Sequence, residues 1–465
     1  MKKEYSNTVY GHFAGEELDE FEEEEMDVEH GAGRSATETT HLLEGRQVPP
    51  STSVHPRHKH HGEATVTEAV LMLLKSFVGT GVLFLGKAFF NGGLLFSTIF
   101  MCAIAAVSLW SFLLLVQVNL KCHAGFGEMG GMLYGPRMRQ AILASIVFSQ
   151  LGFVAAYTVF VAENMQAFVL SITRCETHMS KATLIFIQAI IFLPLSLVRR
   201  IAKLSSTALI ADAFILLGIV YLFYYEIGAI MERGMADVQL FNRELFPLLI
   251  GTAVFTFEGI GLVIPITESM REPQKFPEAL SGVMIGVAVL FASSGALSYM
   301  AFGSDVQTVV ITNLPGNSRF VQAVQALYSI AILLSAPLQL FPALTILEMR
   351  LFKRSGKYDF RTKMRKNFFR CVVVAASMFS AWIGANDLDK FVSLIGSLAC
   401  VPLCFVYPPL LHLRACAETR RQKVLDVLLL LFGIFCVVFA GSQTVQSMME
   451  GSSPPKPPVC IPPDM

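Results

Sequence analysis

The sequence predicts an all-α polytopic membrane protein with about eleven transmembrane helices. Hydrophobic residues make up 53% of the 465 residues and charged residues only 15%, whereas soluble domains carry about 25% charged residues. The charges are clustered, which leaves long apolar tracts, and no tract shows the sustained alternation of a β-strand. A transmembrane barrel is therefore not expected, and helices remain as the way to satisfy the backbone in lipid. An ordinary soluble enzyme and a wholly disordered chain are excluded.

Residues 1–63 differ from the rest of the chain and are predicted to form a disordered cytoplasmic tail. They contain an acidic run over 16–29 and a stretch rich in Pro, Ser and His over 48–62. Such a composition cannot bury enough apolar surface to offset the chain entropy. The tail lacks the basic start and apolar core of a signal peptide. Its histidines are interpreted as part of a polar linker, not as a metal site: His55, His58, His60 and His61.

The transmembrane domain is predicted over 64–447, because every later apolar stretch falls within it. A helix needs about 20 apolar residues to cross a bilayer core of about 30 Å. We place the spans at 66–90, 93–118, 140–171, 182–198, 205–230, 245–265, 278–302, 320–342, 367–384, 388–412 and 423–447. The third is long and the fourth is short. Residues 448–465, which are rich in Pro, are expected to form a disordered outer or luminal tail.

The distribution of Lys and Arg predicts that the N-terminus is cytoplasmic. With that orientation the inner loops hold 21 Lys and Arg, against seven in the outer loops and the outer tail. Cytoplasmic loops carry such an excess of positive charge. The same bias supports an odd number of spans, which places the two ends of the chain on opposite sides.

The first and sixth spans each contain two glycines close together near mid-membrane. Gly79 and Gly81 interrupt the first span, and Gly259 and Gly261 interrupt the sixth beside the acidic Glu258. Each glycine weakens a helix by about 1 kcal/mol relative to Ala. Interrupted helices at matching positions of two halves are typical of transporters built from inverted repeats. Spans 1–5 and 6–10 are then the repeats, and the eleventh is added. The alternative is that these glycines only allow close helix packing.

Broken helices offer the chemistry that a zwitterion needs. The N-terminus of a half-helix attracts a carboxylate, and unwound carbonyl groups attract an ammonium group or a cation. An amino acid carries both groups, so one site binds the part that all amino acids share. The surrounding walls then select the side chain.

Glu258 is the leading candidate for a proton-coupling residue. A carboxylate at membrane depth is costly and indicates a functional site by default. The alternative is that Glu258 caps exposed amides of the break and never changes protonation. Glu163 and Asp212 also lie in apolar surroundings, as proton relays or as helix-packing partners.

Several motifs resemble those of the amino acid/auxin permease family. The stretch 73–81 (LLKSFVGTG), with Asn91-Gly92-Gly93 after it, resembles the family's first helix, and 257–261 (FEGIG) resembles its sixth. The stretch 150–153 (QLGF), followed by Tyr157, is similar to its third helix. The resemblance covers about residues 64–447, and the fungal vacuolar amino acid transporters are the branch that the chain resembles.

This resemblance implies a leucine-transporter-like fold with a 5+5 inverted repeat plus one helix. It also implies proton-linked movement of amino acids, with no cofactor, no metal and no enzymatic step. The residues that would face the substrate are Ser76, Gly79, Thr80 and Gly81 on the first helix, Tyr157 on the third, and Thr256, Phe257, Glu258 and Gly259 on the sixth.

One departure from the family bears on the coupling ion. Animal proton-coupled relatives carry a His just before the Leu-Leu-Lys of the first helix, where this chain has Met72. His titrates near neutral pH, whereas Met does not titrate, so Glu258 becomes the better candidate for coupling. A proton is favoured over sodium as the coupling ion.

The N-terminal tail contains an acidic dileucine pattern. Glu38 is followed four residues later by Leu42 and Leu43, and the partner that such a motif implies is a sorting adaptor. With the family resemblance, it favours the vacuolar or lysosome-like membrane, and the plasma membrane is the alternative. Because that lumen is acidic, protons moving out with the substrate would drive export to the cytosol.

Other functions rank below transport. A sensor that signals through the N-terminal tail is the main alternative, and an ion channel and a membrane enzyme rank lower because no filter sequence, metal triad or nucleophile motif is visible.

The 36 Lys and Arg balance 36 Asp and Glu, so charge gives no sign of a nucleic acid partner. The nine Cys form no CxxC pair, and the open question among them is whether Cys175 and Cys460 pair across the outer side.

Overall fold

The computed structural model describes residues 64–173, 176–177, 179–198, 201–315, 318–352 and 360–450, with the side chains of 201–212 left out. Several sequence predictions therefore lie outside the described residues. These are the two disordered tails except for residues 448–450, the sorting motif Glu38, Leu42 and Leu43, the histidines before residue 62, the Cys175–Cys460 pair and the side chain of Asp212.

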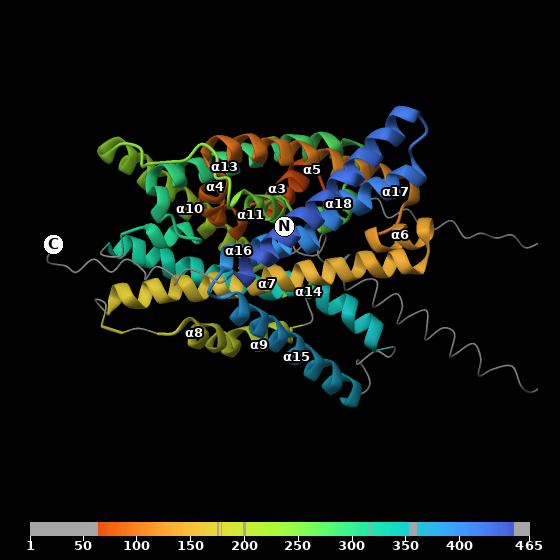
Figure 1. Ribbon diagram of the computed structural model, residues 1–465. Coiled ribbons are helices and arrows are strands. Elements are labelled where there is room, and N and C mark those ends of the chain that lie inside the picture. The colour runs from red at the N-terminus through yellow and green to blue at the C-terminus, as the bar shows by residue number, and fades with distance from the viewer. Residues whose placement is uncertain are drawn as a thin grey trace, which may run out of the picture.

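The described part of the chain is all-helical, and its order follows the predicted spans (Figure 1). The first five predicted spans correspond to α3 (Val66–Phe77) with η1 (Thr80–Phe84) and α4 (Leu85–Gly92), α5 (Leu94–Cys122), α7 (Pro136–Ile172), α8 (Lys181–Ile187) with α9 (Ala189–Ser196), and α10 (Ile201–Arg233). A short helix, α6 (Phe126–Tyr134), connects α5 to α7.

The second half also begins with a broken helix and supplies the remaining spans. Its spans are α11 (Phe246–Thr256) with α12 (Ile260–Ser269), α13 (Phe276–Phe302), α14 (Arg319–Leu351), α15 (Phe360–Gly384), α16 (Leu388–Ile395) with α17 (Tyr407–Ala415), and α18 (Arg420–Met449). Short turns of helix flank α13: η2 (Pro273–Lys275), η3 (Gly303–Asp305) and η4 (Val310–Asn313). Two π-helical turns, η5 (Gly396–Cys400) and η6 (Pro402–Val406), lie between α16 and α17.

Ten helices in the described residues are long and apolar enough to cross a membrane. The fourth predicted span is the exception, because it forms the two short helices α8 and α9. The break falls at Gln188, whose buried side chain donates hydrogen bonds to the carbonyls of Leu184 and Thr158, each at 3.0 Å. Pro194 then stands inside α9, where it lacks an N–H group.

The two predicted helix breaks lie against each other in space. After α3, Gly79 adopts an extended conformation before η1 begins, and Gly259 separates α11 from α12. A Cβ atom on Gly81 would lie 3.2 Å from Cγ2 of Thr256, and one on Gly259 would lie 2.6 Å from the Phe77 ring. The glycines therefore both interrupt the helices and allow the two breaks to pack closely.

The tenth span packs so closely against α11 that the backbones of the two segments are in contact. A Cβ atom on Gly396 would lie 1.9 Å from the carbonyl oxygen of Gly251, and one on Gly251 would lie 2.1 Å from that of Ser393. Both positions exclude any larger residue. The π-helical turns begin at this contact, and such turns are frequent at functional sites.

Candidate functional site

A cavity of about 380 Å³ lies between the two helix breaks. The residues of the breaks that line it are Ser76, Gly79, Thr80 and Gly81 from the first span, and Thr256, Glu258, Gly259 and Gly261 from the sixth. This volume falls within the range of about 300–1,000 Å³ for small-molecule sites. The structure thus brings together residues that lie about 180 positions apart in the sequence.

The third and eighth spans form the walls of the cavity. Gln150, Phe153 and Tyr157 of α7 line it, and so do Gln339 and its neighbours on α14. Nε2 of Gln339 donates a hydrogen bond to Oε1 of Gln150 at 2.7 Å, which joins the two walls. The sequence analysis missed Gln339, although an amide inside an apolar tract was the signal available.

Thr80 presents an unpartnered hydroxyl at the first break. Its side chain is 1% exposed, it lines the cavity, and its Oγ1 has no hydrogen-bond partner among the described residues. A buried polar atom without a partner costs free energy. Thr80 is therefore suited to bind a polar group of a ligand.

Two helical segments begin at the cavity without a side-chain cap. Neither Gly79 at the start of η1 nor Gly259 at the start of α12 supplies a side-chain hydrogen bond to the amides that follow. The first amides of a helix have no partner within the helix, and they carry partial positive charge. The site therefore offers donors for an anionic group such as a carboxylate.

Glu258 lines the cavity and is partly exposed to it. Among the described residues, its carboxyl group has no hydrogen-bond or ion-pair partner. It does not cap the amides of the break through a side-chain hydrogen bond. This placement leaves the carboxyl group available to an ammonium group or a cation that enters the cavity.

Phe257 is the one expected substrate-facing residue that does not line the cavity. Its side chain is fully buried, and its ring centroid lies 5.2 Å from that of Phe291 on α13. In the unwound segment, successive side chains point in different directions. Phe257 therefore anchors the break to α13 while Glu258 faces the cavity.

The cavity reaches the surface at one end of the bundle, which we call the mouth. Its lining there includes Glu128 of α6, Arg139 of α7 and Met349 of α14. The Glu128 and Arg139 side chains are 59% and 55% exposed and lie 3.9 Å apart. Glu268, further inside, accepts a hydrogen bond from Asn119 at 2.8 Å. The mouth lies at the end of the bundle where the inner loops were predicted.

The end of α17 holds together the helices around the mouth. Tyr134 of α6 donates a hydrogen bond to the Leu410 carbonyl at 2.8 Å, and Arg414 stacks on the Tyr134 ring. Partial burial raises the pKa of the Tyr134 hydroxyl, although Arg414 opposes this shift. The hydroxyl therefore stays protonated and remains a donor at neutral pH.

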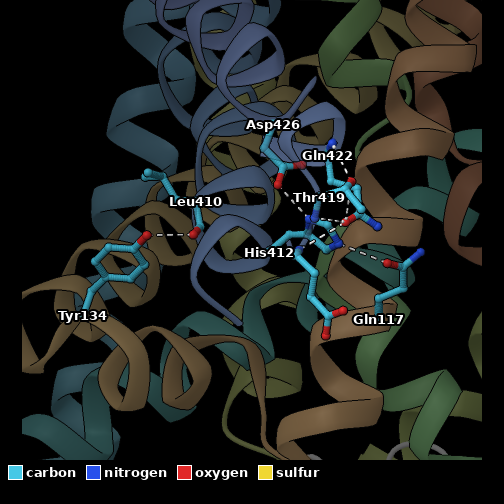
Figure 2. Close-up of polar contacts among 8 residues, drawn as sticks. Gln117, Tyr134, Leu410, His412, Thr419, Gln422 and Asp426 are labelled. Carbon is cyan, nitrogen blue, oxygen red and sulfur yellow. Dashed lines mark hydrogen bonds and ion pairs between the residues drawn. The ribbon is translucent and has the colours of Figure 1, made fainter. Parts of the chain in front are cut away.

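A buried histidine joins the same part of α17 to two further helices (Figure 2). Nδ1 of His412 lies 2.7 Å from Oδ2 of Asp426 on α18, and Nε2 lies 3.1 Å from Oε1 of Gln117 on α5. His412 and Asp426 are 2% and 1% exposed. The sequence analysis missed this network, because only the fold brings the three helices together.

The opposite end of the bundle, which we call the distal end, holds polar contacts between helices. There α4 ends at Gly92, α10 at Arg233 and α13 at Phe302. Lys181 pairs with Glu163 at 2.7 Å and donates to the Ala385 carbonyl at 3.2 Å. Of the two interpretations of Glu163, this contact between α7 and the start of α8 matches the helix-packing partner.

Two broken helices that enclose a ligand-sized site, open to one end of a helical bundle, are typical of membrane transporters. Residues 62–446 match the family described as "Transmembrane amino acid transporter protein". The chain belongs to this family of membrane transporters, which is not a family of enzymes.

Curated relatives agree with this family. The chain is 49% identical over 442 residues to vacuolar amino acid transporter 3 of Schizosaccharomyces pombe, a match that covers 94% of the chain and 67% of the relative. It is 50% identical over 450 residues to vacuolar amino acid transporter 3 of Saccharomyces cerevisiae, which covers 94% and 64%. The chain thus spans about two thirds of the length of these fungal relatives.

Solved structures of transporters share the fold. MHP1, a nucleobase-cation-symport-1 family transporter, superposes with a TM-score of 0.57 at 14% identity, over 87% of this chain and 95% of that one. A Na⁺-coupled sialic acid symporter has a TM-score of 0.51 at 14% identity, over 86% and 92%. The fold is the leucine-transporter-like fold that the family resemblance implies.

Proposed function

We propose that this protein moves amino acids across the vacuolar membrane by alternating access around its two broken helices. The observation that carries the proposal is the cavity between the breaks, with uncapped helix N-termini at its centre. The names of the fungal relatives support the substrate class and the membrane.

The cavity suggests how an amino acid binds. The substrate carboxylate accepts hydrogen bonds from the first amides of η1 and α12, where positive charge is concentrated. The ammonium group lies near Glu258, and the Thr80 hydroxyl bonds to a polar atom of the substrate. Phe153, Tyr157 and the Gln150–Gln339 pair surround the side chain. This mostly uncharged wall favours neutral amino acids.

Proton coupling is assigned to Glu258 in this proposal. Its carboxyl group lines the cavity and has no cationic partner among the described residues. In the loaded site Glu258 carries a proton, and its carbonyl oxygen accepts a hydrogen bond from the substrate ammonium group, so that proton and substrate cross together and leave on the same side. With the mouth on the cytoplasmic side, where the predicted inner loops hold most of the Lys and Arg, an acidic lumen drives export of substrate to the cytosol. The N-terminus then also lies in the cytosol.

Transport assays on protein reconstituted in vesicles test this proposal. We expect a panel of radiolabelled neutral amino acids to enter in response to a pH step but not to a sodium gradient. Glu258→Gln should abolish the pH-driven part of the flux, because the amide cannot exchange a proton. Glu278→Gln, which removes an exposed carboxylate on α13, is the matched control and should retain full flux.

Three outcomes contradict parts of the proposal. If no amino acid moves in wild type, the transport function is wrong. If sodium drives the flux, the coupling ion is wrong. If Glu258→Gln retains pH-driven flux, Glu258 is not the coupling residue.

A further inference from the structure

Glu226 is a buried carboxyl group that lies outside the substrate cavity. It is 0% exposed and lies on α10, near the distal end of the bundle. Oγ of Ser298 on α13 donates a hydrogen bond to its Oε1 at 2.5 Å. Its second oxygen, Oε2, has no hydrogen-bond partner among the described residues. Ser294, one turn earlier on α13, is also buried and has an unpartnered hydroxyl.

No described cation compensates a negative charge on Glu226. The helices packed against α10 are α13 and α14. The titratable and charged groups on the described parts of these three helices are Tyr221, Tyr224, Tyr225, Glu232, Arg233, Glu278, Tyr299, Arg319, Tyr328, Glu348 and Arg350. None of them forms a hydrogen bond or an ion pair with Glu226. Lys87 of α4, behind α13, instead lies over the Phe90 ring at 4.0 Å.

This environment suits a neutral carboxyl group. An ionised carboxylate at membrane depth with no cation beside it is costly, and removing it from water costs several kcal/mol. A neutral carboxyl group with one hydrogen bond costs far less to bury. The packing around Glu226 therefore favours the state in which it carries a proton.

The helix that covers this position is the second half of the broken first span. A Cβ atom on Gly86 of α4 would lie 2.8 Å from Cβ of Ser298, and one on Gly295 of α13 would lie 2.2 Å from the Phe89 ring. The face of α13 that carries Ser298 is therefore in close contact with α4. Separation of α4 from α13 would bring water towards Ser298 and its partner Glu226.

We propose that Glu226 is a proton-binding site that must be occupied for the distal end of the transporter to close. The inference rests on the proposed alternating access, in which α4 moves away from α13 when the distal end opens. In that open state Glu226 meets water and releases its proton to the compartment on that side. Closing requires a proton from the same compartment. The proton thus controls the movement without crossing the membrane, separately from coupling at Glu258.

Hydrogen–deuterium exchange of the full chain in nanodiscs tests this site without any substrate. The readout is the exchange of the α4 amides, Leu85–Gly92, between pH 5 and pH 7.5, corrected for the intrinsic pH dependence of exchange. Binding of one proton shifts the closed-to-open ratio by at most tenfold per pH unit. In wild type we expect α4 to exchange progressively faster as the pH rises.

Variants at Glu226 should remove this pH response. Glu226→Gln and Glu226→Met cannot ionise, so α4 should stay protected at both pH values. Glu232→Gln removes an exposed carboxylate on the same helix and should respond as wild type does. The inference is overturned if α4 in wild type shows no pH response, or if either Glu226 variant retains the wild-type response. Because no flux is measured, these outcomes are independent of whether the transport assays succeed.

Discussion

Gly259 and Gly261 stand two positions apart in one motif, yet their surroundings differ. A Cβ atom on Gly259 would lie 2.6 Å from the Phe77 ring, whereas one on Gly261 would meet nothing within 4 Å. Gly259 is thus required by the contact between the two breaks. Gly261 stands inside α12, where it lowers the stability of the helix as any glycine does at an interior position.

These surroundings predict opposite effects for two matched substitutions. Gly259→Ala should lower the melting temperature and reduce transport at least tenfold, because the breaks must separate to admit the methyl group. Gly261→Ala should retain the fold and gain up to about 1 kcal/mol of helix stability. Thermal melts and flux assays on both variants measure the difference. Equal effects would show that the contact with Phe77 does not determine the geometry of the break.

Sequence patterns located some residues of the site but not others. Gly79, Gly81 and Glu258 stood out because glycine pairs and a carboxylate are unusual in apolar tracts. Gln339 and the unpartnered state of Thr80 depend on which helices face each other, and one sequence does not contain that information. Phe257 was placed at the substrate by the family resemblance, and spacing offered no correction because the direction of each side chain in an unwound segment cannot be read from it.

At the scale of elements, α17 connects the helices that surround the mouth. His412 contacts Asp426 on α18 and Gln117 on α5, and Leu410 accepts a hydrogen bond from α6. Movement of α17 would therefore change three neighbours together. This makes α17 a structural support for the cytoplasmic side of the proposed transport path.

Asp426→Ala should weaken this support. It leaves the buried Nδ1 of His412 without its partner, and such an unsatisfied group costs about 1–3 kcal/mol. We expect a lower melting temperature in detergent, together with faster amide exchange in α17. The control is Glu418→Ala, an exposed change in the loop before α18, which should have little effect. A double-mutant cycle with His412→Ala isolates the pair, and zero coupling energy would contradict its importance.

Most helix boundaries followed apolar length to within a few residues, but α14 runs to Leu351 and α15 begins at Phe360, nine and seven residues beyond the predicted limits. The first and sixth spans were predicted to break at their glycine pairs, and the breaks fall at Gly79 and Gly259, whereas Gly261 lies inside α12. The fourth was predicted as a single short span, but Gln188 divides it. An amide that bonds to the backbone of α7 is a tertiary contact, which hydropathy does not detect.

At the scale of the whole molecule, we propose that residues 64 and 450, which bound the described helical part of the chain, lie on opposite sides of the membrane. This follows if α8 and α9 together count as one crossing beside the ten long helices. A pH-sensitive fluorescent protein fused to the N-terminus should then report the neutral cytosol in intact vacuole-containing cells. The same reporter fused to the C-terminus should report the acidic lumen. Identical signals from both fusions would show an even number of crossings.

The divided fourth span also has a consequence for the surrounding lipid. Its two helices together cover Lys181–Ser196, which at about 1.5 Å per residue is roughly 24 Å of helix. The hydrocarbon core of a bilayer is about 30 Å thick. Exposed apolar side chains, including Phe186 and Ile190, are suited to face the acyl chains here. The bilayer should therefore thin locally beside α8 and α9, so that long-chain lipids impose a hydrophobic mismatch on this face of the protein.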